Sequence, residues 1–129
     1  MTGVQTCALP IYDSSASLDA YHFTCACLNR GHTISRIFFY RDGIYNALAT
    51  TLPPDDEINL TTLWGKLAAD YQLDLVVCIS AAQRRGLLCE DEAKRQQRSD
   101  VYVAEGFRIA GLGLWVEAVS EADRVMVFS

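Results

Sequence analysis

The sequence has little positive charge and no long apolar run. Eleven lysines and arginines stand against sixteen aspartates and glutamates among 129 residues, so the net charge is −5. This balance argues against sequence-independent binding of nucleic acid, which requires a basic face. No apolar run approaches the roughly 20 residues of a membrane-spanning helix, and no basic segment precedes an apolar stretch as in a secretory signal peptide. We therefore expect a cytoplasmic protein that has no direct contact with nucleic acid or membrane.

The sequence also lacks a cysteine framework. It has five cysteines, an odd number, and no two of them form a Cys-x-x-Cys pair. Structural zinc sites typically use such closely spaced pairs, and small disulfide scaffolds use an even number of cysteines. We therefore expect reduced thiols, no metal site and no cofactor. The five cysteines are Cys7, Cys25, Cys27, Cys78 and Cys89.

What the chain does contain is a regular alternation of strand and helix patterns. Its length and its share of hydrophobic residues (50%) are ordinary for one globular domain. Apolar residues at helical spacing, such as Leu60, Trp64 and Leu67, predict helices, and short apolar runs between turn signals predict strands. Such alternation is typical of an α/β fold, here a three-layer α/β/α sandwich with a mostly parallel, five-stranded sheet. The predicted helices cover 14–30, 60–71, 80–85, 90–98 and 112–122, and the predicted strands 33–39, 75–79, 107–110 and 124–128.

The first eleven residues differ in character from the rest of the chain. The stretch from Val4 to Ile11 reads like a translated sequencing adapter. We therefore interpret residues 1–11 as a non-native segment that stands in for the first strand, and residues 12–129 as the natural domain. The fold needs a strand there, although Pro10 cannot donate a hydrogen bond to a sheet.

The stretch around Cys78 is the part of the sequence that points to chemistry. Residues 75–77 are an apolar run typical of a buried parallel strand, and residues 80–85 can form a short helix that stops at Gly86. Cys78 would then lie just beyond the carboxyl end of a strand, where sites gather in open α/β sheets. It would also lie at a helix N-terminus, which favours a thiolate. We therefore predict that Cys78 is a nucleophile.

A second loop should lie at the same edge of the sheet. The strand over 33–39 ends in residues 40–46, which contain the turn signal Asp42-Gly43. Tyr40 and Arg41 in this loop, together with Arg84 after the cysteine, are candidates to contact the sulfur at Cys78. The alternative interpretation is a well-packed loop with exposed polar tips.

The remaining cysteines and glycines have structural interpretations. Cys27 shares an apolar helical face with Ala20, so it is expected to be a small core residue. Cys89 is expected to be a semi-buried thiol rather than a resolving partner of Cys78. Gly111-Leu112-Gly113 lacks the third glycine of a dinucleotide-binding loop, and we interpret it as a tight turn with close helix–strand packing.

Four blocks of the sequence together resemble a known family. They are Phe38-Phe39-Tyr40-Arg41-Asp42-Gly43, Cys78 with Ala81-Ala82-Gln83-Arg84-Arg85-Gly86, Phe107-Arg108-Ile109-Ala110-Gly111-Leu112-Gly113 and Ala122-Asp123-Arg124-Val125. They resemble the DsrE/TusD family of sulfurtransferase subunits, found in the DsrEFH and TusBCD sulfur-relay complexes. The resemblance extends from about Tyr12 to Phe128, and the block around Cys78 is its most specific part.

The resemblance implies a DsrEFH-like sandwich and a sulfurtransferase that carries a persulfide on Cys78. It also implies assembly with two homologous kinds of subunit into a heterohexamer, and sulfur exchange with small persulfide donor and acceptor proteins. Such complexes serve either 2-thiolation of the wobble uridine in tRNA or cytoplasmic dissimilatory oxidation of stored sulfur. Residues 50–56 and 78–83 resemble the sulfur-oxidising branch of the family slightly more, and both routes stay open.

Three alternatives to a sulfur carrier follow from the residues. In the first, the chain is a non-catalytic assembly subunit in which Cys78 is an inert buried thiol. In the second, it is a small-ligand module of flavodoxin-like shape, which would need a phosphate loop where residues 12–17 contain hydroxyls but no glycine. A thiol redox enzyme, the third, would need another cysteine close to Cys78 in the sequence, and Cys-x-x-Cys is absent there.

Overall fold

The chain folds into alternating strands and helices. The computed structural model describes residues 3–8, 15–97 and 103–128, the first of these ranges as backbone only. In chain order the elements are β1 (Gly3–Ala8), α1 (Ala16–Asn29), β2 (Thr33–Phe39), the 3₁₀ helix η1 (Arg41–Ala47), α2 (Leu60–Tyr71), β3 (Leu75–Cys78), α3 (Ile79–Arg84), α4 (Glu90–Arg95), β4 (Phe107–Ala110), α5 (Gly113–Glu121) and β5 (Arg124–Phe128).

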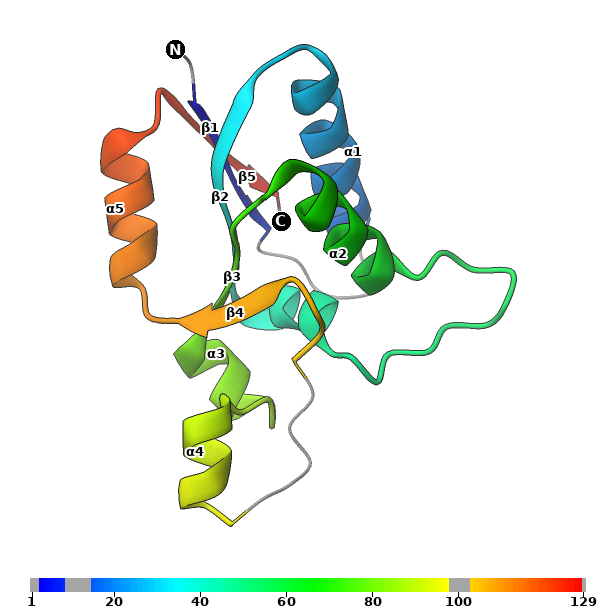
Figure 1. Cartoon of the computed structure of the whole chain (residues 1–129), viewed down its shortest axis with the longest axis vertical. Coiled ribbons are helices and arrows are strands. Elements are labelled where there is room, and N and C mark those ends of the chain that lie inside the picture. Colours follow the sequence, from blue (N-terminus) through cyan, green and yellow to red (C-terminus); the bar gives the residue numbers. More distant parts are fainter. Residues whose placement is uncertain (1–2, 9–14, 98–102, 129) are drawn as a thin grey trace.

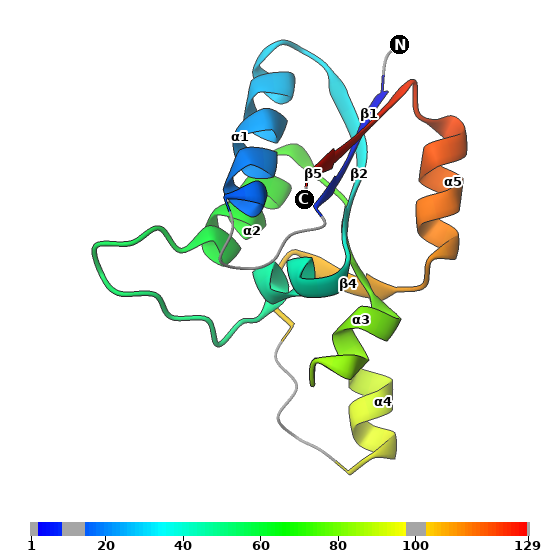
Figure 2. The ribbon, with the colours of Figure 1, turned by 180° about the vertical axis from the view of Figure 1, so that it is seen from behind.

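The described strands form one sheet in the order β4-β3-β2-β1-β5, and every neighbouring pair is parallel. Helices α1 and α2 lie against one face of this sheet and α5 lies against the other, as the two opposite views show (Figures 1 and 2). The predicted α/β sandwich with a parallel sheet is therefore confirmed. Parallel strands require crossover connections, and helices in those connections cover both faces.

Aromatic side chains fill the space between the sheet and its helices. Trp64 of α2 is fully buried and meets Phe39 of β2 edge to face, with ring centroids 5.4 Å apart. On the opposite face, Phe38 packs against Trp115 of α5 at 5.7 Å. Successive residues of a strand point to opposite faces, so Phe38 and Phe39 join the sheet to both helical layers. Burying a large aromatic side chain contributes about 2–3 kcal/mol.

Most sequence-predicted elements are confirmed to within two residues. The strand over 33–39 and the helix over 60–71 have the predicted bounds, and Cys27 lies in the core as expected. The predicted helix over 90–98 ends at Arg95, and its last residue lies outside the described part of the chain. The loop over 40–46 is in fact the 3₁₀ helix η1, a tight form with little sequence signature of its own.

The N-terminal segment does form the first strand. β1 pairs with β2 on one side and β5 on the other, which makes it an interior strand of the described sheet. This confirms the expectation that the fold needs a strand here. The non-native origin of residues 1–11 and the domain boundary at residue 12 stay predictions, and Pro10 lies outside the described residues.

The expected close packing at Gly111 and Gly113 is wrong. A Cβ atom added at either glycine would meet no atom within 4 Å, so both glycines face open space at the turn into α5. Close packing occurs instead between Gly65 of α2 and the segment before β4. A Cβ on Gly65 would lie 2.9 Å from the carbonyl oxygen of Glu105. This approach joins two elements that are distant in sequence, which sequence spacing does not reveal.

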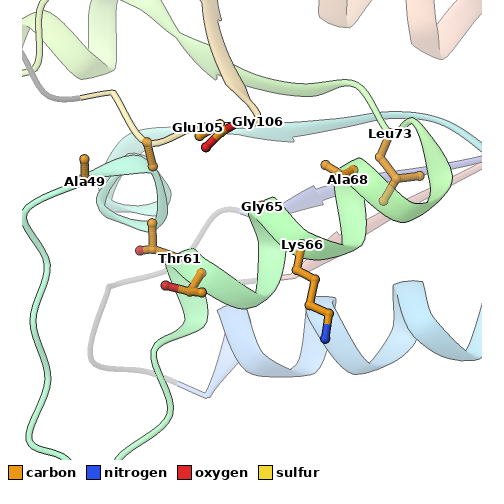
Figure 3. A pocket seen from close by; sticks show the side chains of 11 residues that line it. Ala49, Thr61, Gly65, Lys66, Ala68, Leu73, Glu105 and Gly106 are labelled. Carbon is orange, nitrogen blue, oxygen red and sulfur yellow. The ribbon is translucent and has the colours of Figure 1, made fainter.

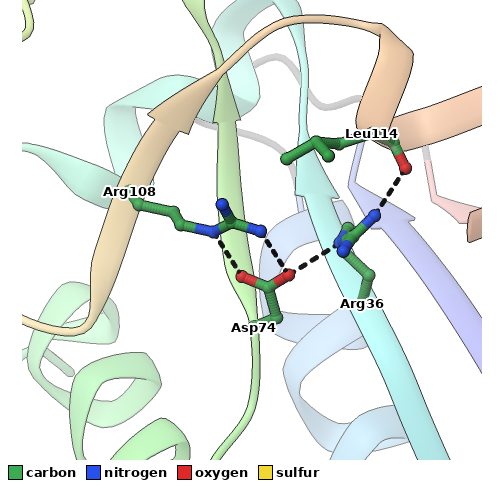
Figure 4. A network of polar contacts seen from close by, with 4 residues as sticks. All are labelled: Arg36, Asp74, Arg108 and Leu114. Atoms are coloured by element: carbon green, nitrogen blue, oxygen red, sulfur yellow. Dashed lines mark hydrogen bonds and ion pairs between the residues drawn. The ribbon is translucent and has the colours of Figure 1, made fainter. Parts of the chain in front are cut away.

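A charged network joins the amino-terminal side of β3 to its neighbouring strands (Figure 4). Asp74, just before β3, accepts hydrogen bonds from Arg36 of β2 and Arg108 of β4, with the shortest at 2.7 Å in each case. Arg36 also donates to the carbonyl oxygen of Leu114 in α5 at 2.7 Å. Hydrogen bonds from Arg108, and next from Arg36, lower the pKa of Asp74 although its burial opposes this. The network therefore stabilises the sheet at the end opposite Cys78.

Candidate functional site

Cys78 occupies the junction between β3 and α3. It is the last residue of the strand and the N-cap of the helix, with extended backbone angles. The predicted strand-to-helix junction is therefore confirmed, but Cys78 is the last residue of the strand and does not lie beyond its end. Its side chain makes no capping hydrogen bond, so the sulfur is not held by the helix amides. The residue is only 1% exposed.

The elements around Cys78 explain this burial. Cys78 lies opposite Ala110 in the register between β3 and β4. η1 contacts both β3 and α3, and α3 also contacts β4. The side chains that these elements contribute to the core include Ile44, Ala81 and Ala82. The thiol therefore belongs to the apolar core, and this burial limits the access of a reagent to it.

An ion pair connects the far end of α3 to η1. Nε of Arg85 donates to Oδ1 of Asp42 at 2.9 Å, and Nη1 of Arg85 donates to the carbonyl oxygen of Ala81 at 3.1 Å. The side chains are 23% exposed for Arg85 and 37% for Asp42, so water screens the pair only partly. Only six helical residues separate Cys78 from Arg85. The pair therefore lies at the opposite end of α3 from the thiol.

The three other candidate residues lie around η1 and α3 but do not bond to Cys78. Tyr40 is half-buried at the start of η1, and the guanidinium of Arg41 lies 5.8 Å from its ring centroid. Arg84 is exposed at the last residue of α3. Within the described part of the chain, no hydrogen bond or ion pair joins these side chains to the thiol.

Sequence reasoning chose Arg84 and passed over Arg85. Within α3, Ala81 and Ala82 are buried whereas Ser80, Gln83 and Arg84 are exposed. Arg85 follows Ala81 by four residues and so lies on the buried face of the helix. The helical position relative to the two alanines was the signal that could have found it. Its partner, Asp42, is 43 residues away, and local periodicity does not indicate such a distant contact.

The backbone of η1 begins with an uncommon conformation. Arg41 has φ +51°, in the left-handed region that residues other than glycine rarely adopt. Such a residue costs of order 1 kcal/mol or more and persists only where surrounding contacts impose it. It directly precedes Asp42. The placement of the Asp42 carboxylate opposite Arg85 thus depends on a conformation that the rest of the fold maintains.

The other described cysteines lie on different elements. Cys25, Cys27 and Cys89 are free thiols like Cys78, and burial raises the pKa of the Cys27 thiol. Cys89 is half-buried at the N-cap of α4, as expected for a semi-buried thiol. Across the described ranges, no group of three or more histidine, cysteine and acidic side chains has a metal-binding arrangement. None of the described helices has the length and apolar character of a membrane-spanning segment.

A cavity of about 680 Å³ lies away from the cysteine, between α2 and residues 104–106 (Figure 3). Its lining includes Gly65 and Gly106, whose backbones approach closely, and the buried hydroxyl of Thr61, which has no hydrogen-bond partner. None of its lining residues belongs to β3, η1 or α3. Sequence reasoning did not predict this cavity, and it is separate from the thiol.

Comparison with known proteins now assigns the chain to a family. The model of the DsrE/DsrF-like family matches residues 7–128, nearly the whole length. The chain belongs to the DsrE/DsrF-like family. It is 47% identical over 117 residues to the putative sulfurtransferase DsrE of Allochromatium vinosum, which covers 91% of this chain and 90% of that one. The predicted resemblance is therefore confirmed.

Other relatives carry the second name of the predicted pair. The chain is 42% identical over 118 residues to the sulfurtransferase TusD homolog of Vibrio parahaemolyticus, with 92% of this chain and 90% of that one covered. It is 40% identical over 119 residues to sulfurtransferase TusD of Salmonella typhi, with 92% and 93% covered. The crystal structure of the ychN protein from E. coli superposes with a TM-score of 0.77 and covers 99% of both chains. At 16% identity this last match shows the fold alone.

Proposed function

We propose that this protein is a sulfurtransferase of a sulfur relay and that Cys78 carries the transferred sulfur as a persulfide. The observation that carries the proposal is the position of Cys78, at the carboxyl end of an interior strand and the start of α3. Sites in open parallel sheets form at this edge. The names of the DsrE and TusD relatives support sulfur transfer as the reaction.

The reaction exchanges one sulfur–sulfur bond for another. The Cys78 thiolate attacks the outer sulfur of a donor persulfide, R–S–SH. The S–S bond of the donor breaks, the donor leaves as the thiolate R–S⁻, and Cys78–S–SH forms. An acceptor thiolate then attacks the outer sulfur and regenerates the Cys78 thiolate. There is no net oxidation or reduction, so these steps call for no metal, nucleotide or flavin. Their rates depend on the thiolate fraction and on access to the sulfur.

The candidate residues around the thiol have assignable roles in this scheme. Arg41 and Arg84 would stabilise the negative charge of the terminal sulfur as it approaches, and Tyr40 would donate a hydrogen bond to it. Their positions on η1 and α3, the two elements next to Cys78, support these roles. Because Arg41 and Arg84 are exposed, they would act on a bound partner more readily than on the enclosed thiol.

The proposed partners are sister subunits of the same fold, in a heterohexamer, and small donor and acceptor proteins. Exposed apolar side chains on α5 and β5 support assembly, since such residues mark interaction surfaces when they are contiguous. β5 is also an edge strand of the described sheet. The exposed apolar residues on α5 and β5 are Val116, Val119, Val125, Met126 and Val127. Either tRNA 2-thiolation or sulfur oxidation in the cytoplasm fits this scheme.

One observation favours the second candidate, a non-catalytic assembly subunit. Cys78 is almost fully buried and packs within the hydrophobic core. Buried structural cysteines behave as small apolar residues and are inert. In that case the apolar surface on α5 and β5 would be the functional part of the chain. The two candidates differ in whether sulfur becomes bound to Cys78.

Intact-mass spectrometry after incubation with glutathione persulfide separates the two candidates. We expect the wild type to gain the mass of one or more sulfur atoms and to lose it on reduction. Peptide mass mapping should place a sulfur on Cys78, and Cys78→Ser should lose that gain whereas the matched variant Cys89→Ser should keep it. No sulfur on Cys78 even when a persulfide-loaded partner protein serves as the donor would establish the assembly subunit instead.

A further inference from the structure

The sulfur carrier proposed above has a thiol that is almost fully buried. Cys78 is 1% exposed, yet persulfide exchange requires an in-line approach of one sulfur to another. Some element next to the thiol must therefore move before each transfer. β4, α3 and η1 all adjoin the carboxyl end of β3. β4 is held to β3 by the hydrogen-bonded ladder of the sheet, so α3 and η1, which contact each other, are the elements that can separate.

Both α3 and η1 contribute apolar side chains to the core, and a charged contact joins them at the carboxyl end of α3. Ala81 and Ala82 of α3 and Ile44 of η1 are buried in the shared core. At the carboxyl end of α3, Arg85 donates to the Asp42 carboxylate of η1 at 2.9 Å. The same guanidinium donates to the carbonyl oxygen of Ala81, and this bond fixes its direction along the helix. Separating α3 from η1 therefore requires the Asp42–Arg85 bond to break.

We propose that the Asp42–Arg85 ion pair controls access to Cys78, by holding α3 against η1 while the thiol is idle and releasing it when a partner binds. This inference rests on the proposed function for its purpose, but the movement itself can be measured without any sulfur transfer. Two further features of the pair fit this role. It is partly exposed, so an incoming protein with charged groups can compete for either member. Asp42 directly follows Arg41, whose left-handed backbone is uncommon for arginine. This conformation favours rearrangement of the start of η1 once the contact with Arg85 is lost.

The test is the alkylation rate of each cysteine in the folded protein, resolved by mass spectrometry of peptides after timed exposure to iodoacetamide. Asp42→Asn keeps the shape of the side chain and removes its charge. Breaking a partly exposed ion pair should raise the alkylation rate of Cys78 about three- to tenfold. Cys25 and Cys89 in the same sample serve as internal references and should react at unchanged rates.

Two more variants test the pair rather than the residue. Arg85→Lys keeps the positive charge but cannot bond the Asp42 carboxylate and the Ala81 carbonyl in the same geometry. The alkylation rate of Cys78 should therefore lie between those of the wild type and Asp42→Asn. The exchange of both charges, Asp42→Arg with Arg85→Asp, should restore a slow rate. Arg95→Gln serves as the matched control because it removes an arginine from an exposed pair whose two members both belong to α4. Added salt should accelerate alkylation of wild-type Cys78 but not of Asp42→Asn.

The outcomes separate this inference from the proposed function. An unchanged alkylation rate of Cys78 in Asp42→Asn overturns access control by the pair. An equal rise in the alkylation rates of all cysteines also overturns it, because such a rise reflects general unfolding. If Cys78 alone becomes faster but never gains sulfur from glutathione persulfide, the pair controls access and the carrier function fails. If Cys78 gains sulfur at the same rate in wild type and Asp42→Asn, the carrier function stands and the inference is overturned.

Discussion

The carboxylate of Asp74 accepts two hydrogen bonds from the guanidinium of Arg108, at 2.7 and 2.8 Å. This two-bond geometry is the strongest common form of ion pair in proteins. Asp74 also accepts a bond from Arg36, whose side chain is only 15% exposed. One carboxylate thus holds two arginines from the strands on either side of β3. If it were lost, Arg36 would lose the Asp74 counter-charge in a partly buried site, while its bond to the Leu114 carbonyl of α5 would remain.

We predict that Asp74→Asn lowers the free energy of unfolding by about 1–3 kcal/mol, because a buried or half-buried cation loses its counter-charge. Denaturant unfolding followed by circular dichroism measures this change. The matched control is Glu90→Gln, which breaks an exposed pair with Lys94 on α4 and should change stability by less than about 0.5 kcal/mol. Equal effects of the two variants would contradict a special contribution from the network.

Stability should also depend on pH through the same carboxylate. Its pKa is lower in the folded protein than its ordinary value of 3.8, chiefly because of Arg108. A lowered pKa means that the unfolded chain binds the proton more readily, so the contribution of Asp74 is complete above about pH 5 and is lost as the pH falls through the folded pKa. Unfolding free energies measured from about pH 6 to about pH 3 should fall less steeply for Asp74→Asn than for the wild type. Parallel profiles would contradict this assignment.

The close approach of Gly65 to Glu105 predicts a further cost. Gly65→Ala would place a methyl group 2.9 Å from a backbone oxygen, which has no flexible end that can move away. Although alanine favours helix by about 1 kcal/mol, overpacking costs about 1–3 kcal/mol. We expect a net loss of stability, measured as a lower melting temperature. Gly113→Ala is the control, since its Cβ would meet nothing within 4 Å and should leave stability equal or higher. A Gly65→Ala protein as stable as the wild type would show that residues 103–106 shift freely.

Local patterns predicted a large part of this fold. The spacing of Leu60, Trp64 and Leu67 identified α2, and the apolar run before Cys78 identified β3, because these signals depend only on residues within two or three turns. The first strand was also expected where β1 lies, because the fold needs a first strand there, but its interior place in the sheet was not predicted. The 3₁₀ form of η1 was not predicted, as its short turns are stabilised by packing against β3 and α3.

The candidate site divides in the same way. Cys78 was identified from sequence because a strand followed at once by a helix can be recognised locally, and its family resemblance follows from blocks that are contiguous in the chain. Helical spacing from Ala81 could have indicated that Arg85 and not Arg84 lies on the buried face, but it could not have indicated the partner of Arg85. That partner, Asp42, comes from another loop.

By itself, the sequence determined the order of strands and helices, the family and the place of Cys78 at the end of a strand. Each of these is encoded by short-range periodicity or by contiguous motifs. Only the tertiary structure decided that the thiol is enclosed, that Asp42 meets Arg85, and that Gly65 touches the segment before β4. These features depend on distances between elements some 40 residues apart, which packing of the whole core sets and no local pattern records.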